Sequence, residues 1–235
     1  MPLSGGDSVS GLRGWFSRLA PERRTDSVRP AAVPEPAPSE DPVVASKVLP
    51  KFLSYLATRP APIILDVGPF SGSNVTFFGQ LLSCKVLIED LFEDLDRHAR
   101  EGRLDALPSF LSKRFTVEDA SVDGVLLWDL CDYLDRPAAQ ALGSALARLL
   151  RPDGALLAFF GNASHIGSPC TKFIVADESH LRVRPHASTV ARQGWLQNRD
   201  IIKMFEGMRV ADSYLLKNGR REMLFRKGGV GRPII

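Results

Sequence analysis

The stretch PIILDVGPFSGS, which runs from Pro62 to Ser73, decides the fold of this chain. Its short apolar run ends in Asp66, and a turn that contains Gly68 and Gly72 follows at once. The residues after the turn, 73–82, have the apolar spacing of a helix. A buried strand, a glycine-bearing turn and a helix start together predict one unit of a parallel α/β sheet.

A turn of this kind commonly holds a nucleotide-like cofactor, because it brings backbone N–H groups and a helix N-terminus to the ligand. The dinucleotide pattern Gly-x-Gly-x-x-Gly fails here, since Phe70 and Ser73 occupy its second and third glycine positions. The phosphate-binding Walker loop fails as well, because no Gly-Lys-Ser/Thr follows the turn. The turn therefore indicates a cofactor site of another type.

The composition sets broad limits on the function. A chain of 235 residues with 44% apolar residues can bury one sizeable core, and no apolar run reaches membrane-spanning length. A formal charge of +3 does not support nucleic-acid binding. The four histidines lack ligand spacing, so no metal site is predicted and each of them, His98 included, is expected at the surface or in a loop. The odd number of separated cysteines and the lack of a secretory signal predict a cytoplasmic protein; the cysteines, expected to be small buried side chains, are Cys84, Cys131 and Cys170.

The sequence divides into a folded domain and two flanking segments. Residues 1–41 are rich in Pro, Gly and Ser and predict a disordered tail. Within this tail, Gly11–Leu19 fits either a short amphipathic helix or a frayed segment with two aromatic residues. Residues 42–228 form the predicted α/β domain, and 229–235 a flexible end. The domain is expected to open with a helix over 43–56, with Pro50 as an awkward interior residue.

Strand-like and helix-like segments alternate through most of the domain, which predicts a largely parallel sheet covered on both faces. The expected strands are 63–66, 85–89, 124–130 and 155–160, and the expected helices are 73–82, 91–100 and 136–150. The last part is expected to contain a helix over 199–205 and strands over 209–216 and 222–226. Asn218-Gly219 between those two strands is a strong hairpin signal, so the final strand should be antiparallel to its predecessor.

Taken together, residues 43–228 resemble the class I S-adenosylmethionine-dependent methyltransferases. The resemblance is carried by Asp66 with the glycine turn, by Glu89 at the end of the second strand, and by the strand–aspartate pattern of residues 123–130. It is also carried by the sequence Leu-Arg-Pro-Asp-Gly at 150–154 before an apolar strand, and by the closing hairpin.

This resemblance implies a doubly wound, mostly parallel seven-stranded sheet with an antiparallel C-terminal strand. It implies S-adenosyl-L-methionine as cofactor and an unidentified small-molecule acceptor. Asp129 and Asp132 lie just past the fourth strand, where either could orient a substrate or accept a proton, and Asp129 is the candidate for a catalytic role. The implied cofactor-binding residues are Asp66, Gly68, Pro69, Phe70, Gly72, Glu89, Asp90, Trp128 and Asp129. Phe70 stands where the family usually has a third glycine, which motivates the alternative of a non-catalytic methyltransferase-like binding module. The oligomeric state is not indicated.

The region over 162–195 is the expected substrate zone, and it fits either a solvated loop or a small hairpin. Its residues Arg182, Arg184 and Arg192 are candidates for binding an anionic substrate, with solvated arginines as the alternative. Asp132 is interpreted as an acid at a helix N-terminus. The basic run that includes Arg220 and Arg226 is interpreted as a solvated sheet edge.

Overall fold

The strand before the glycine turn, β2 (Ile63–Asp66), lies inside a six-stranded sheet of order β3-β2-β4-β5-β9-β8. This computed structural model describes residues 41–192 and 194–229. Strands β3, β2, β4 and β5 are parallel, and β9 is antiparallel to both of its neighbours. The other strands are β3 (Lys85–Ile88), β4 (Val122–Trp128), β5 (Leu150–Phe160), β8 (Met208–Leu215) and β9 (Arg221–Lys227). The mostly parallel sheet with a reversed C-terminal strand is therefore confirmed.

The predicted count of seven strands is wrong for the part of the chain that is described, because this sheet has six. Between β3 and β4 the chain forms α3 (Leu91–Arg100), a 3-10 helix, η1 (Leu104–Ala106), and α4 (Leu107–Lys113). No further strand of these residues extends the sheet beyond β3, which is left as an edge strand.

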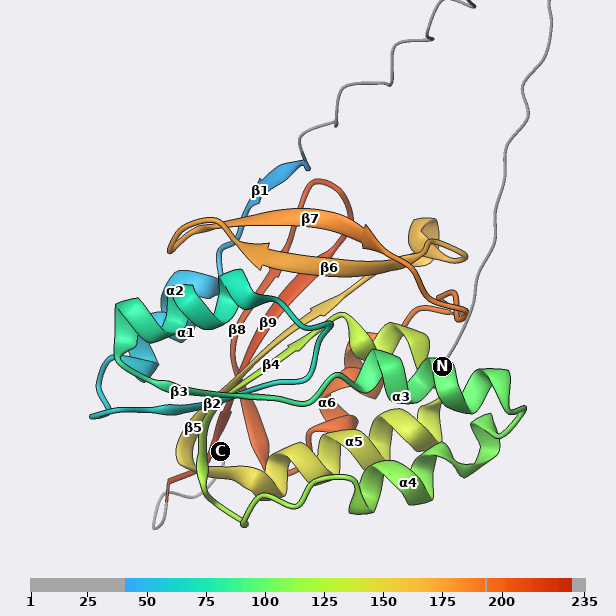
Figure 1. Ribbon diagram of the computed structural model, residues 1–235, viewed down its shortest axis with the longest axis horizontal. Helices are drawn as coiled ribbons and strands as arrows, with labels where there is room; N and C mark the ends of the chain where they lie inside the picture. Colours follow the sequence, from blue (N-terminus) through green and yellow to red (C-terminus); the bar gives the residue numbers. More distant parts are fainter. Residues whose placement is uncertain (1–40, 193, 230–235) are drawn as a thin grey trace, which may run out of the picture. The chain divides into compact units, whose positions relative to one another are not determined.

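Helices cover both faces of the large sheet, as predicted for a doubly wound fold (Figure 1). One apolar core joins the sheet to α3, α4, α5 (Arg136–Leu149) and α6 (Asn198–Met204). The second core, on the opposite face, joins it to α1 (Leu49–Leu56) and α2 (Gly72–Leu82). Among the described helices, none combines the length and the apolar composition that a membrane crossing requires.

A second, three-stranded sheet of order β1-β7-β6 completes the face that carries α1 and α2 (Figure 1). Its strands are β1 (Val43–Ala45), β6 (Cys170–Val175) and β7 (His180–His186). The expected substrate zone is therefore a hairpin, one of the two predicted forms. Asn74, at the start of α2, donates to the Phe173 carbonyl at 3.0 Å and accepts from the Val175 N–H at 2.8 Å. These bonds join β6 to the helix that follows the glycine turn.

The first helix begins later than predicted. Residues 43–45 form β1, and α1 starts at Leu49 with Pro50 in its first turn. A first-turn N–H has no partner within the helix, so Pro50 costs no hydrogen bond there. The carboxylate of Glu222 on β9 instead accepts from the N–H groups of Lys47 and Val48, which fixes the entry to this helix.

Two predictions about polar side chains are wrong. The basic run does not form a solvated edge, because β9 lies between β5 and β8. Arg226 is buried, with its guanidinium 3.8 Å from the Tyr55 ring centroid. His98, expected at the surface, is also buried, and its Nδ1 lies 2.8 Å from the Asp94 carbonyl oxygen.

The cysteine prediction is confirmed for Cys131 and Cys170, which are buried, whereas Cys84 is half-buried; all three are free thiols. The predicted tail, except Asp41, and the predicted flexible end, except Gly229, lie outside the described residues.

Candidate functional site

Asp66 ends β2 and faces its own glycine turn. Its Oδ1 atom accepts from the Gly68 N–H at 3.1 Å and from the Trp128 indole N–H at 2.7 Å. Burial raises the pKa of this carboxyl to about 6, although both hydrogen bonds act to lower it. One oxygen of Asp66 is thus already engaged by the protein at the expected cofactor turn.

Trp128, the last residue of β4, covers that turn. A Cβ atom added to Gly68 would lie only 2.4 Å from the indole Cδ1, so the indole packs directly on the glycine backbone. The same indole stacks on Phe173 of β6, with ring centroids 5.4 Å apart and planes 9° apart. The backbone of Trp128 has φ 54°, which is uncommon for a bulky residue. Gly68 is therefore required for the fit of Trp128.

The acids after β3 have different partners. Glu89 is 21% exposed in its side chain, and its carboxylate lies 2.7 Å from Arg114 Nη1. Asp90 caps α3, because its Oδ1 accepts from the N–H groups of Phe92 and Glu93. The other oxygen of Asp90 accepts from the Phe70 N–H at 3.1 Å. Asp90 thus fastens the glycine turn to α3, whereas Glu89 still borders solvent.

The remaining residues of the glycine turn are less tightly packed than Gly68. Phe70 is 58% exposed. A Cβ atom added to Gly72 would meet only the tip of the Phe70 ring, at 4.0 Å. Pro69, which lacks an N–H, lies between Gly68 and Phe70, so the turn presents few donors at this point. The exposed Phe70 ring marks the open end of the site.

Asp129, the candidate catalytic residue, is completely buried. Its Oδ2 atom accepts from Arg192 Nη2 at 2.9 Å, and the other nitrogen of this guanidinium, Nη1, lies 2.7 Å from Asp132 Oδ2. Burial raises the pKa of Asp129, and it raises the pKa of Asp132 to about 7. We call these three residues the buried ion cluster.

The residues around the buried ion cluster leave space for the Arg192 guanidinium. A Cβ atom added to Gly161, directly after β5, would lie 1.6 Å from Arg192 Nη1, so only glycine leaves the necessary space. The Gly161 N–H donates to Asp132 at 2.7 Å, and the guanidinium lies 5.2 Å from the Tyr133 ring centroid. Asp132 is not at the N-terminus of α5, which Asp135 caps through the Ala138 N–H, but it is an acid in the first turn of the short 3-10 helix η2 (Leu130–Tyr133).

Two of the predicted anion-binding arginines have protein partners. Arg192 belongs to the buried ion cluster, and Arg184 pairs with Asp41 at 2.6 Å. Arg182 is exposed. The cluster role of Arg192 was not predicted, because 63 residues separate Arg192 from Asp129 and no local pattern links them.

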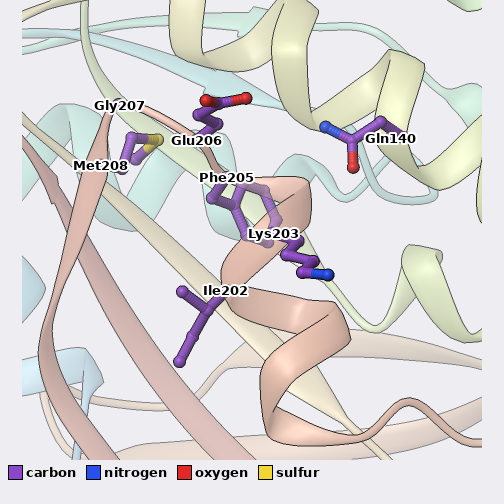
Figure 2. Close-up of a pocket in the computed structure, with 7 residues that line it drawn as sticks. All are labelled: Gln140, Ile202, Lys203, Phe205, Glu206, Gly207 and Met208. Atoms are coloured by element: carbon purple, nitrogen blue, oxygen red, sulfur yellow. The ribbon is translucent and has the colours of Figure 1, made fainter.

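The sheet thus brings the predicted residues to its carboxyl edge, where ligands of open α/β sheets bind. A different cavity, of about 580 Å³, lies between α5 and the connection from α6 to β8 (Figure 2). Gln140 contributes from α5, and Phe205 and Met208 from the other side. Met208 begins β8, which runs parallel to β5, so this cavity lies at the opposite edge of the sheet.

The strand order, with β9 alone reversed, defines the Rossmann-like fold of class I methyltransferases with one strand fewer than predicted. No protein-family model matches the sequence, and no curated protein matches it significantly.

Solved structures with similar folds include a Burkholderia thailandensis 1,6-didemethyltoxoflavin-N1-methyltransferase with bound S-adenosylhomocysteine. It is 18% identical with a TM-score of 0.44, covering 77% of each chain. A Mesorhizobium loti S-adenosylmethionine-dependent methyltransferase is 12% identical with a TM-score of 0.45, covering 76% of this chain and 98% of its own. An S-adenosylmethionine-dependent methyltransferase from Clostridium acetobutylicum is 11% identical with a TM-score of 0.44, covering 79% of this chain and 93% of its own. Similarities of this size do not argue for an activity, and the fold assignment rests on the strand order.

Proposed function

We propose that this chain is an S-adenosylmethionine-dependent methyltransferase that acts on a small molecule. The observation that carries the proposal is the strand order with its single reversed strand, combined with Asp66 and Glu89 at the carboxyl ends of the neighbouring strands β2 and β3. A carboxylate at the end of the second strand is suited to accept hydrogen bonds from ribose hydroxyls.

The residues fit the two halves of this cofactor unequally. Glu89, whose carboxylate is partly exposed, fits a ribose. The methionyl half does not fit the observed side-chain arrangement, because the Trp128 indole covers Gly68. Binding of the whole cofactor requires the indole to leave the glycine turn.

Isothermal titration with S-adenosylmethionine and with S-adenosylhomocysteine tests the proposal. We expect Glu89→Gln to weaken binding by about 10–100-fold, the effect of losing a charged hydrogen-bond partner. Glu93→Gln is the matched control, because Glu93 is exposed on α3, near Glu89 in the sequence. The absence of binding to the wild type at about 1 mM of either compound would refute the proposal.

Tryptophan fluorescence reports whether the indole moves. The chain has three tryptophans, so Trp15→Phe together with Trp195→Phe leaves Trp128 as the sole fluorophore. We expect cofactor addition to shift its emission to the red, since the indole passes from a buried to a wetter position. Binding without any change in emission would contradict the requirement for movement.

A second candidate is a methyltransferase-like binding module without activity. The observation that favours it is the filled crevice, where Trp128 lies on Gly68 and Arg192 engages Asp129. This candidate predicts no affinity for either compound in the titration above.

We also propose the cytoplasm as the location, because three free cysteines suit a reducing compartment. The division into a tail over 1–41, a domain over 42–228 and an end over 229–235 stays a proposal. Limited proteolysis followed by mass spectrometry tests it, with cleavage expected before residue 42 and after residue 228 and protection between them.

A further inference from the structure

A second cavity, of about 210 Å³, lies at the carboxyl end of β5. It opens between the three-stranded sheet and the turn that joins β8 to β9. Its walls are mainly apolar, and its polar lining includes two side chains of opposite charge. The lining residues that matter here are Phe159, Phe173, Leu181, Val183, Arg220 and Glu222.

The two charged side chains differ in what satisfies them. Glu222 Oε2 accepts from Lys47 N at 2.7 Å, Val48 N at 3.1 Å and Ser46 Oγ at 3.2 Å. The start of α1 therefore compensates this carboxylate. The Nε atom of Arg220 is buried and has no hydrogen-bond partner among the described residues.

Arg220 also forms no ion pair with any residue that the structure describes. Its guanidinium lies 4.9 Å from the Phe173 ring centroid, so it packs against the wall of the cavity. Its positive charge acts to lower the pKa of three buried carboxyls, those of Asp129, Asp132 and Glu222, but the close ion pairs of Asp129 and Asp132 are with Arg192. Arg220 is therefore the cation of this cavity whose Nε donor has no partner among the described residues, and its planar fork of donors suits a carboxylate.

The position of the cavity connects it to the glycine turn. Arg220 packs on Phe173, Phe173 stacks on Trp128, and Trp128 covers Gly68. The aromatic pair Phe173 and Trp128 thus lies between this cavity and the expected cofactor turn. A molecule bound on Arg220 would occupy the acceptor side of the crevice.

We propose that this cavity binds a small carboxylic acid with an apolar body, whose carboxylate pairs with Arg220. The apolar body lies against Val44, Val183 and Leu216, the apolar lining residues that are only half-buried. The assignment of this acid as the methyl acceptor rests on the proposed function. The assignment of the binding site does not rest on it.

Saturation-transfer NMR titration with benzoate tests the proposal, because benzoate combines a carboxylate with a compact aromatic body. We expect benzoate to bind with a Kd of about 1 mM or tighter, as for a well-placed fragment. Benzamide, its neutral analogue, should bind at least about tenfold more weakly, since it lacks the charge. Arg220→Gln should weaken benzoate binding about tenfold or more and leave benzamide nearly unchanged.

Arg209→Gln is the matched control, because it removes an exposed arginine of the paired strand β8 outside the cavity. It should bind benzoate as the wild type does, and Arg220→Lys should keep part of the affinity. Thermal unfolding of each variant checks that the fold is intact. Equal benzoate affinity in wild type and Arg220→Gln would overturn the proposal, as would no benzoate binding at about 20 mM.

The benzoate titration needs no cofactor, so the two proposals fail separately. Benzoate binding without S-adenosylmethionine binding would retain the carboxylate site and remove its role as acceptor site. Cofactor binding without benzoate binding would retain the proposed methyltransferase function and remove the carboxylate site.

Discussion

The two ends of the candidate site differ in how completely the protein's own side chains occupy them. At the β4 end, Trp128 and Arg192 are both 2% exposed, and each lies against a glycine that has no room for a Cβ atom. At the β3 end, Glu89 and Phe70 border solvent, and Gly72 has room to spare.

This difference shows that the same sheet edge serves two purposes. At the β4 end the glycines make space for residues of the protein itself, so glycine there is a packing requirement. At the β3 end the polar groups hold the turn in place and leave an accessible carboxylate. A glycine pattern alone cannot separate these purposes, since both require a close approach to the backbone.

The largest expected effect comes from Arg192→Met, which keeps much of the side-chain volume but leaves Asp129 and Asp132 without their cation. We expect a loss of about 3–5 kcal/mol in the free energy of unfolding, because buried carboxylates are left unpaired. Urea unfolding at pH 7.5 measures it. Arg184→Met is the control, and its exposed pair with Asp41 should contribute no more than about 1 kcal/mol. Similar losses in both variants would remove the distinction between a closed and an open end.

The pH dependence of stability tests the burial of Asp66. Burial raises the pKa of its carboxyl from 3.8 to about 6, so the folded state keeps a proton that the unfolded state releases. This contribution to stability is present at low pH and is lost as the pH rises through about 6. Asp66→Asn keeps an Oδ1 acceptor for Gly68 and Trp128 but cannot ionise.

We therefore expect the stability of Asp66→Asn relative to wild type to rise by about 1–3 kcal/mol between pH 4 and pH 7. Urea unfolding at several pH values measures this change. Parallel pH profiles for the two proteins would show that Asp66 is not buried as described.

Gly68→Ala tests the contact with Trp128 directly. The added methyl would lie 2.4 Å from the indole, so the indole must shift, at a cost of about 1–3 kcal/mol. Gly79→Ala is the matched control, since Gly79 lies within α2, the helix that follows the turn, with nothing within 4 Å of an added Cβ. The control should gain up to about 1 kcal/mol from helix propensity. A neutral Gly68→Ala would mean that the turn is open, and the comparison would then fail at its closed end.

The smallest effect is expected at the open end, from Asp90→Ala. This change removes the cap of α3 and the acceptor for the Phe70 N–H, at a cost of about 1 kcal/mol. Chemical denaturation compares it with Glu93→Ala on the same helix. Within the described part of the chain, Glu93 makes no side-chain hydrogen bond to the glycine turn, so this change should alter stability by less than about 0.5 kcal/mol. A larger loss than that of Arg192→Met would reverse the ranking of the two ends.

Much of the fold could be predicted because its signals are local. The strand at 63–66 and the helix at 91–100 have the predicted boundaries, since apolar periodicity and turn residues specify them within a few positions. Asn218-Gly219 likewise predicted the reversed strand. The start of α1 was misplaced, because the apolar spacing of 43–56 runs across a strand and a helix.

The side-chain arrangement of the site could not be predicted in the same way. Trp128 donates a hydrogen bond to Asp66, which is 62 residues away in the sequence, and Arg192 donates one to Asp129, which is 63 residues away. Such contacts depend on how the hairpin β6–β7 and the segment after it pack on the sheet, and no spacing in the sequence encodes this. The basic run was misinterpreted for a related reason, since the location of β9 inside the sheet is a property of the topology.

The location of β9 between β5 and β8 has a consequence for synthesis of the protein. Strand β5 pairs with β4 on one side, but its other partner is β9, near the end of the described residues. During translation β5 therefore presents an open strand edge to other nascent chains until β9 has emerged from the ribosome. The interval before β9 pairs is when the growing polypeptide is most exposed to intermolecular strand addition.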